Sequence, residues 1–200
     1  MCGQYYIAEE DRQAFYATMA EVLKKAEAMR QSAVVSGVVR PTNTAGALAT
    51  NARNRSIGAF PMRWGFKHPQ KGFLIINTRA ETAQSKALFE RSTRERRCLL
   101  PASGYYEWKT ENGVKRKYCF QGEEKGPLYL AGLYLWTPEM QLPCFSILTR
   151  EAPPPLAKIH ERMPVILPEA AAKRWLSPDG VYAALLREAR EDIAYFAQDA

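Results

Sequence analysis

A cysteine follows the initiator methionine in the tripeptide Met1-Cys2-Gly3, and this position gives it unusual chemistry. Methionine before a small residue is normally removed, which would leave Cys2 with a free α-amine next to its thiol. An α-amino group titrates at about 7.7–8.0, far below lysine, and is therefore a useful nucleophile near neutral pH. Together the two groups trap an aldehyde, first as a Schiff base and then as a thiazolidine. The alternative is that Cys2 has no chemical role.

A polar segment, Asn77-Thr78-Arg79-Ala80-Glu81-Thr82, follows the apolar stretch Phe73–Ile76, which is predicted as a strand. Functional sites are often built where a strand gives way to a loop. Asn77 offers a hydrogen-bond donor and an acceptor, and Arg79 presents a rigid fork that suits phosphate. The alternative is a surface loop in which Asn77 caps a turn and Arg79 pairs with Glu81 in solvent.

A glutamate lies within the aromatic segment Gly-Tyr-Tyr-Glu-Trp, as Glu107. In an alternating strand Glu107 shares one face with Tyr105 and Lys109. A carboxyl group between aromatic side chains tends to be partly buried, and desolvation raises its pKa toward the range useful for proton transfer. The alternative is a surface glutamate paired across a hairpin with Lys115 or Lys117.

The segment Ile159–Pro164 contains one of the two histidines of the chain. His160 is predicted to end a short helical segment just before a strand, and a histidine changes protonation near neutral pH. Arg162 adds a group that suits phosphate to the same junction. The alternative is a structural histidine, and His68 is predicted to lie in an exposed loop.

The composition is typical of a soluble globular protein, with 200 residues, 46% hydrophobic and 24% charged. The net charge of +7 favours a polyanionic partner, although many basic proteins bind no nucleic acid. No stretch has the length of a membrane span and no signal peptide is recognised. The cysteines show no metal-ligand spacing, which favours a reduced, cytoplasmic chain with Cys98, Cys119 and Cys144 in strands or the core.

The elements that must position these residues follow from hydrophobic periodicity. Three- and four-residue spacing predicts an amphipathic helix over Glu9–Ser32, with Phe15, Met19, Val22, Leu23 and Ala26 facing the core. Short apolar runs bounded by turn residues predict strands, and an Asn112-Gly113 turn predicts a hairpin. The predicted strands are Ala33–Val39, Ser56–Trp64, Gly72–Ile76, Arg97–Leu100, Tyr105–Lys109, Val114–Phe120, Leu128–Trp136 and Pro143–Thr149.

Helices are predicted again toward the end of the chain, around Pro154–His160, at Pro168–Leu176 and from Val181 onward. The order of elements predicts an α+β fold with a mixed, mostly antiparallel sheet or barrel core and peripheral helices. No long linker divides the chain, so residues 1–200 are expected to form a single domain.

These motifs together resemble the SRAP family, the SOS-response-associated peptidase-like proteins that capture abasic sites in DNA. The family pattern combines Met-Cys-Gly, Asn-x-Arg-x-Glu-x, Arg-Cys-Leu-x-Pro-x-x-Gly-x-x-Glu-Trp and Ile-His-x-Arg-Met-Pro. The chain shows Met1-Cys2-Gly3, Asn77–Thr82, Arg97–Trp108 and Ile159–Pro164 in this order, and Arg40-Pro41-Thr42, Ala131–Tyr134 and Ile147–Thr149 also fit. Four separated motifs in family order are a specific signal.

The resemblance implies a mechanism. The Cys2 amine attacks the C1′ aldehyde of ring-opened deoxyribose, and the Cys2 thiol closes a thiazolidine crosslink. Asn77 is expected to position the sugar or Cys2, and Glu107 to orient the amine and relay its proton. His160 is expected to open the sugar ring and to assist crosslink reversal or β-elimination. The Schiff base accounts for the lyase activity that the family can show.

The resemblance also implies the partner, single-stranded DNA that contains an abasic site, bound by a monomer associated with DNA in the cytoplasm. Arg79 and Arg162 are expected to bind phosphates, and Thr149, Pro41 and Trp64 are further expected DNA contacts. No metal or organic cofactor is implied.

Two positions depart from the family pattern. Gln4 stands where family members commonly have arginine, which removes one cation near the nucleophile. The segment Lys67–Lys71 is short and lacks a further tryptophan that wedges against DNA in many members. Weaker, less salt-dependent DNA binding is the expected result. The basic run Arg91–Arg97 is interpreted as a solvated helix end, with a DNA contact as the alternative.

Three functions are consistent with these residues and motifs. The first is capture of abasic sites, and the second is a cysteine hydrolase in which Cys2 is the nucleophile and Glu107 or His160 the base, including self-catalysed removal of Met1. The hydrolase leaves Arg79 and Arg162 without a task. The third is a non-catalytic nucleic-acid-binding module, which leaves the combination of Cys2, Asn77, Glu107 and His160 unexplained.

Overall fold

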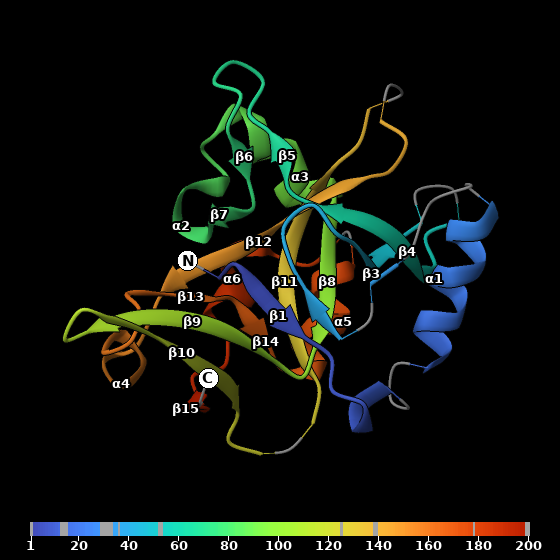
Figure 1. Cartoon of the computed structure of the whole chain (residues 1–200). Helices are drawn as coiled ribbons and strands as arrows, with labels where there is room; N and C mark the ends of the chain where they lie inside the picture. Colours follow the sequence, from blue (N-terminus) through green and yellow to red (C-terminus); the bar gives the residue numbers. More distant parts are fainter. Residues whose placement is uncertain are drawn as a thin grey trace.

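The computed structural model describes residues 2–12, 16–28, 34–35, 37–51, 54–124, 126–137, 140–177 and 179–198. These residues form two large sheets and a two-stranded ribbon, with helices packed around them (Figure 1). No helix in these ranges is long and apolar enough to cross a membrane. The predicted α+β class, with a mostly antiparallel core and peripheral helices, is confirmed.

The larger sheet closes on itself as a barrel. Its strands follow the order β13-β12-β4-β3-β8-β11-β14, and an additional pairing of β11 with β12 closes the ring. Closure leaves five barrel strands without a free edge, which protects their backbone hydrogen-bonding groups. The strands are β3 (Thr44–Thr50), β4 (Ile57–Trp64), β8 (Arg97–Ala102), β11 (Leu128–Leu135), β12 (Cys144–Glu151), β13 (Arg162–Pro164) and β14 (Ile166–Leu167).

A second sheet packs beside the barrel in the order β15-β10-β9-β1-β2. Its strands are β1 (Gln4–Tyr6), β2 (Val38–Val39), β9 (Gly104–Glu111), β10 (Val114–Gly122) and β15 (Ile193–Gln198). The predicted hairpin is present, because Asn112 and Gly113 both have positive φ, at 50° and 78°, as a two-residue type I′ turn requires. The strands β5 (Phe66–Lys67) and β6 (Leu74–Ile75) form a small separate ribbon, and β7 (Asn77–Arg79) joins the barrel by pairing with β12.

Most helices lie on the outside of the barrel, whereas α4 packs against β15 of the second sheet (Figure 1). They are α1 (Tyr16–Ala28), α2 (Ala80–Ala83), α3 (Ala87–Glu95), α4 (Pro154–Ala157), α5 (Glu169–Leu176) and α6 (Tyr182–Arg187), with a 3-10 turn, η1, at Glu10–Arg12. One apolar cluster fills the barrel around Trp64 and Phe145, and a second lies beneath α5 around Trp175. Cys98, Cys119 and Cys144 lie in strands, as predicted, and are free thiols.

The predicted first helix, Glu9–Ser32, is confirmed only in part. Tyr16–Ala28 is helical, but Glu10–Arg12 is a 3-10 turn, and residues 13–15 and 29–32 lie outside the described residues. Val22 and Ala26 are buried as predicted, but Leu23 is 52% exposed. The side chains of Phe15 and Met19 lie outside the described residues.

Four further predictions of secondary structure need correction. The strands β1 and β3 were not predicted, and only Val38–Val39 of the described part of Ala33–Val39 is strand. The segment Asn77–Thr82 is not a loop: Asn77–Arg79 forms the strand β7, and the short helix α2 begins at Ala80. The chain after Val181 is not wholly helical, because it ends in β15, which pairs with β10.

Candidate active site

The first strand places Cys2 against the hairpin that contains Glu107. β1 pairs antiparallel with β9, with Gln4 opposite Tyr106 and Tyr5 opposite Tyr105. Continued by one residue, this register sets Gly3 opposite Glu107. Gly104, at the start of β9, permits this approach, because a Cβ there would collide with the carbonyl oxygen of Phe120 and with the Tyr6 ring.

Cys2 itself is fully buried, at 0% exposure. The Asn77 side-chain amide donates a hydrogen bond of 2.9 Å to the Cys2 carbonyl oxygen. The thiol lies 3.6 Å from the carbonyl oxygen of Gln4, to which it donates. Burial raises the pKa of the Cys2 thiol, and the nearby Glu107 charge raises it further. The thiol is therefore protonated at neutral pH, and its reactivity depends on a base that removes the proton.

Glu107 is buried in the same place, with 3% exposure. Its cross-strand neighbour is Tyr118, whereas Lys117 lies opposite Trp108. The alternative of a surface glutamate paired with a lysine is therefore wrong. Burial raises the pKa of Glu107 to about 7, where the carboxyl group exchanges protons readily at neutral pH.

Two buried polar atoms near Cys2 have no hydrogen-bond partner among the described residues, the side-chain oxygen of Asn77 and the hydroxyl of Tyr105. Tyr105 belongs to the same apolar cluster as Cys2, and their electrostatic interaction contributes to a raised pKa of Tyr105, after burial. Buried polar groups are normally satisfied, so these two atoms are available to a polar ligand. Sequence reasoning treated Tyr105 only as an aromatic neighbour of Glu107.

The central strand β12 brings the remaining motifs together. It pairs parallel with β7, so that Thr149 lies opposite Arg79, and antiparallel with β13, so that Thr149 also lies opposite Pro164. A buried hydrogen bond of 2.8 Å between the hydroxyls of Thr78 and Ser146 fixes β7 to β12. Three motifs that are distant in the sequence therefore meet at one end of β12 (Figure 1).

The two arginines of these motifs differ in their surroundings. Arg162 donates two hydrogen bonds of 2.9 Å to the carboxylate oxygens of Glu81 and one of 2.7 Å to the carbonyl oxygen of Thr149. Its side chain is only 11% exposed. Arg79 is exposed and does not pair with Glu81 in the described part of the chain, so the solvated Arg79–Glu81 pair of the loop alternative is absent.

His160 lies just before a strand, as predicted, but it does not end the helix, because α4 stops at Ala157. Its Nδ1 atom lies 3.0 Å from the backbone nitrogen of Arg162 and 3.1 Å from the carbonyl oxygen of the same residue, so it accepts from the first in one neutral tautomer and donates to the second in the other. Burial lowers the pKa of His160. His68 is half-buried rather than exposed, because its Nδ1 accepts from the backbone N–H groups of Gln70 and Lys71 and its ring packs on Phe73.

Trp64, expected as a DNA contact, requires correction. It is fully buried, donates 2.9 Å to the carbonyl oxygen of Ile76 and stacks on Phe145, so it presents no surface to a strand. Pro41 is half-buried in the turn after β2. Its neighbour Arg40 is exposed and donates 2.6 Å from Nε to the Gln4 side-chain oxygen, when that amide oxygen faces Arg40.

The contact between Arg40 and Gln4 escaped the sequence analysis. Gln4 stands where the family commonly has an arginine, so β1 lacks a positive charge at this position. The guanidinium of Arg40 lies at the end of the Gln4 side chain and supplies a positive charge there. The signal that points to it is the position of Arg40 directly before Pro41 in a matching motif. No group of three or more potential metal ligands gathers among the residues that the structure describes.

The arrangement as a whole is a buried site in which a thiol, a carboxyl group and a side-chain amide lie close together. Asn77 fixes the Cys2 backbone, and Glu107 has a pKa of about 7 beside it. The guanidinium of Arg162 lies on β13, and the imidazole of His160 lies just before it. Such a set suits proton transfer coupled to nucleophilic attack on a carbonyl carbon.

Curated proteins with similar sequences have related names. The chain is 33% identical over 149 residues to the abasic site processing protein YoaM of Bacillus subtilis, and this match covers 70% of the chain but only 65% of YoaM. It is 26% identical over 184 residues to the abasic site processing protein YedK of Escherichia coli, covering 88% of the chain and 79% of YedK. The chain thus spans slightly less than two thirds of its Bacillus relative.

Solved structures share the fold. A protein from Bacteroides thetaiotaomicron superposes with a TM-score of 0.77 at 19% identity, covering 98% of this chain and 91% of that protein. A phage-related protein from Bordetella bronchiseptica gives 0.73 at 23% identity, covering 100% and 95%. The family model of the SOS response associated peptidase, SRAP, matches residues 1–196. The chain therefore belongs to the SRAP family.

Proposed function

We propose that this protein processes abasic sites in DNA by capturing the ring-opened deoxyribose covalently through Cys2. The observation that supports this most directly is the buried Glu107 carboxyl, with a pKa of about 7, beside a Cys2 that Asn77 holds by its carbonyl group. The names of YoaM and YedK support the same substrate. The reaction requires removal of Met1, because an amide nitrogen is not a nucleophile.

The reaction has two steps, formation of a Schiff base and closure of the thiazolidine ring. The lone pair of the Cys2 amine attacks the C1′ aldehyde, and loss of one water gives a Schiff base. The Cys2 sulfur then adds to the same carbon while its proton passes to nitrogen, which closes the thiazolidine. Glu107 accepts the proton of the attacking amine and returns a proton to the departing hydroxyl, and its pKa near neutrality serves both tasks.

His160 opens the sugar. The tautomer that carries out this step is the one in which Nδ1 accepts the backbone N–H of Arg162 and the proton is on Nε2, from which it is donated to the ring oxygen of the deoxyribose. In the reverse direction the imidazole removes a proton during crosslink reversal or β-elimination, which is the lyase branch of the proposal. An abasic nucleotide lacks a base to unstack, so its entry into a buried site is less costly than that of a paired nucleotide.

Single-stranded DNA is the proposed partner, bound through exposed cations around the buried site. Arg79 and Arg40 are exposed and positioned to bind phosphate, whereas Arg162 first has to exchange Glu81 for a phosphate oxygen. Thr149 acts by orienting Arg162 through its carbonyl oxygen. Pro41 remains a proposed contact next to Arg40.

The test separates the amine from the thiol. Wild-type protein without Met1 is incubated with an abasic oligonucleotide and heated, with and without borohydride. The proposal predicts a heat-stable adduct without borohydride for wild type, and an adduct only after borohydride reduction for Cys2→Ser, which keeps the amine but not the thiol. A heat-stable adduct of Cys2→Ser without reduction would contradict the thiazolidine, and cleavage of peptides by the unreacted protein would instead favour the hydrolase.

A further inference from the structure

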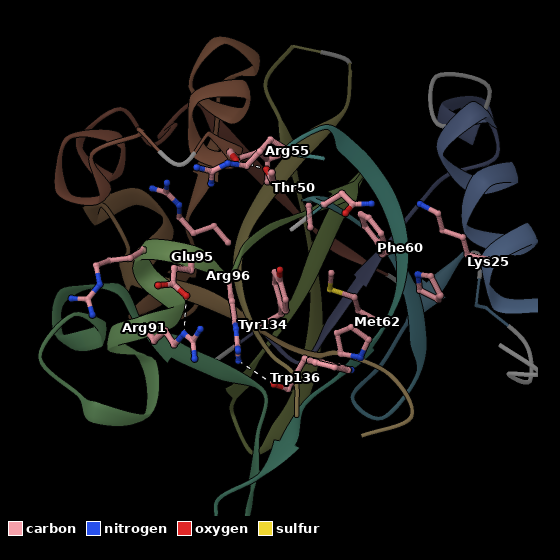
Figure 2. A pocket seen from close by; sticks show the side chains of 17 residues that line it. Lys25, Thr50, Arg55, Phe60, Met62, Arg91, Glu95, Arg96, Tyr134 and Trp136 are labelled. Carbon is pink, nitrogen blue, oxygen red and sulfur yellow. Dashed lines mark hydrogen bonds and ion pairs between the residues drawn. The ribbon is translucent and has the colours of Figure 1, made fainter. Parts of the chain in front are cut away.

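A large pocket lies away from the candidate active site. It has a volume of about 790 Å³, within the range of ligand-binding pockets, and none of the proposed catalytic or phosphate-binding residues lines it. Its walls come from β3, β4, the end of α3 with the start of β8, and the end of β11 (Figure 2). We call it the α3 pocket.

The α3 pocket lies at the opposite end of β12 from Cys2. Pro143, directly before β12, lines the pocket, whereas Thr149 of the same strand contacts Arg162 at the candidate active site. Six residues of extended strand span roughly 20 Å, at about 3.3 Å each. The two sites are therefore separate, but one extended polymer can reach both.

The residues that line the α3 pocket carry an excess of positive charge. Six of its lining residues are basic and one, Glu95, is acidic; the basic residues are Lys25, Arg55, Arg91, Arg94, Arg96 and Arg97. Three of these cations are paired with glutamates, in the pairs Lys25–Glu21, Arg91–Glu95 and Arg94–Glu90. In the described part of the chain Arg55, Arg96 and Arg97 form no ion pair. This excess of positive charge favours an anionic ligand.

Arg96 is the basic residue of the pocket that contacts Trp136. Arg97 is only 6% exposed and donates to the carbonyl oxygens of Gly180 and Ser177, so it stabilises the wall of the pocket. Arg96 is half-buried and donates 3.1 Å to the carbonyl oxygen of Trp136 with one nitrogen, which fixes the guanidinium at the rim while leaving other donors for a ligand (Figure 2).

The floor of the α3 pocket is apolar and aromatic. Met62, Phe60 and Tyr134 line it, and Trp136 stands at the rim with 45% of its surface exposed. An exposed tryptophan next to arginines is the combination that binds unpaired nucleotides, because a base stacks on the ring while the phosphate contacts the cations. A small inorganic anion leaves the apolar floor without a use.

We propose that the α3 pocket binds one undamaged, unpaired nucleotide of a single DNA strand, with the base against Trp136 and the flanking phosphate at Arg96. The inference rests on the proposed function, because the nucleotide belongs to the DNA strand that carries the abasic site. It adds a second, non-covalent contact to the covalent bond at Cys2. The basic run Arg91–Arg97 is interpreted from sequence as a solvated helix end. In this proposal one of its residues, Arg96, binds phosphate.

The test uses the full chain carrying Cys2→Ala and an oligothymidylate of about 12 nucleotides without an abasic site, within the usual range of single-strand site sizes. The readout is the indole N–H resonance of Trp136 in NMR spectra, assigned by its loss in Trp136→Ala. We expect the oligonucleotide to shift this resonance, and Arg96→Gln to weaken the titration about five- to tenfold. Arg187→Gln removes an equal charge from an exposed helix residue outside the pocket and is expected to change it less than about twofold.

Two competing ligands complete the test. Thymidine 5′-monophosphate that binds as tightly as the oligonucleotide would overturn the assignment to a strand, and so would an acidic peptide that displaces the oligonucleotide equally well. An unshifted Trp136 resonance would overturn the pocket itself. Because the probe has no abasic site and no covalent bond forms, failure here leaves the capture reaction intact, and failure of capture leaves this measurement valid.

Discussion

The two ends of β12 differ in how far their polar and charged groups are exposed to solvent. At the end near Thr149, Cys2 and Glu107 are almost fully buried, and Arg162 already has a carboxylate partner. At the other end, an exposed Trp136 and a half-buried Arg96 lie beside an apolar floor. Chemistry requires groups that are desolvated and fixed before the substrate arrives, whereas binding requires charge and aromatic surface that remain accessible.

Blocking the Cys2 amine is expected to have the largest effect on the buried end. A residue placed before Cys2, including a retained Met1, turns the amine into an amide and prevents Schiff base formation. We expect the adduct to fall to background, while binding of an undamaged single strand changes less than about threefold. Adduct yield is compared with the fraction of protein that lacks Met1, determined by mass spectrometry. Full crosslinking by an extended chain would remove the amine from the mechanism.

Removing the acid–base group comes next. Glu107→Gln is expected to slow adduct formation about 100-fold, the lower end of a general acid–base contribution. The wild-type rate is expected to show an inflection near pH 7, the pKa of Glu107, which the variant loses. Adduct formation is followed under single-turnover conditions from about pH 5.5 to 8.5, below the ordinary lysine range. Glu161→Gln serves as the control, and an inflection that persists in Glu107→Gln would assign it to another group.

The burial of Glu107 also predicts a change in stability. Its pKa is raised in the folded state, so the folded protein binds the proton more tightly, and stability falls as the pH rises from about 4.5 to 7. A rise of this size corresponds to about 3 kcal/mol at pH above 7. Glu107→Gln should therefore unfold with a larger free energy than wild type above pH 7, and the difference should vanish near pH 4. Chemical denaturation at several pH values measures it, and a less stable variant at pH 8 would contradict the buried carboxylate.

Releasing Arg162 makes the two ends more alike. Glu81→Gln removes the carboxylate charge that holds the guanidinium, at a cost of about 1 kcal/mol in unfolding free energy, because Glu81 is 47% exposed and solvent screens the pair. The freed Arg162 is expected to make binding of a single strand more salt-dependent, by up to about one unit of slope. Binding is titrated at several salt concentrations, with Glu161→Gln as control. An unchanged slope would mean that Arg162 stays bound within the protein.

The smallest effect is expected from the open end. Trp136→Ala should change the rate of adduct formation less than about threefold on an abasic trinucleotide, which is too short to span the roughly 20 Å between the sites. On a longer strand the variant should weaken binding before capture. Single-turnover rates and their dependence on protein concentration separate the two, and a large loss with the trinucleotide would show that the ends are not independent.

The sequence predicted those parts whose determinants are local. The β9–β10 hairpin follows from Asn112-Gly113 between alternating residues, and the motifs around Asn77, Glu107 and His160 are contiguous. The strand β1 was missed because three residues show too little periodicity, and β15 because its pairing with β10 depends on contacts with residues about 75 positions earlier. The burial of Trp64 and the partnership of Arg162 with Glu81 likewise arise only where β4, β7, β12 and β13 meet.

Covalent capture through Cys2 can be tested by the intact mass of the protein after incubation with a single-stranded oligonucleotide that carries one abasic site. We expect a heat-stable species with the mass of the chain without Met1 plus the oligonucleotide, less one water, and we expect this species to be absent for Cys2→Ala. An unchanged mass for protein that has demonstrably lost Met1 would contradict it.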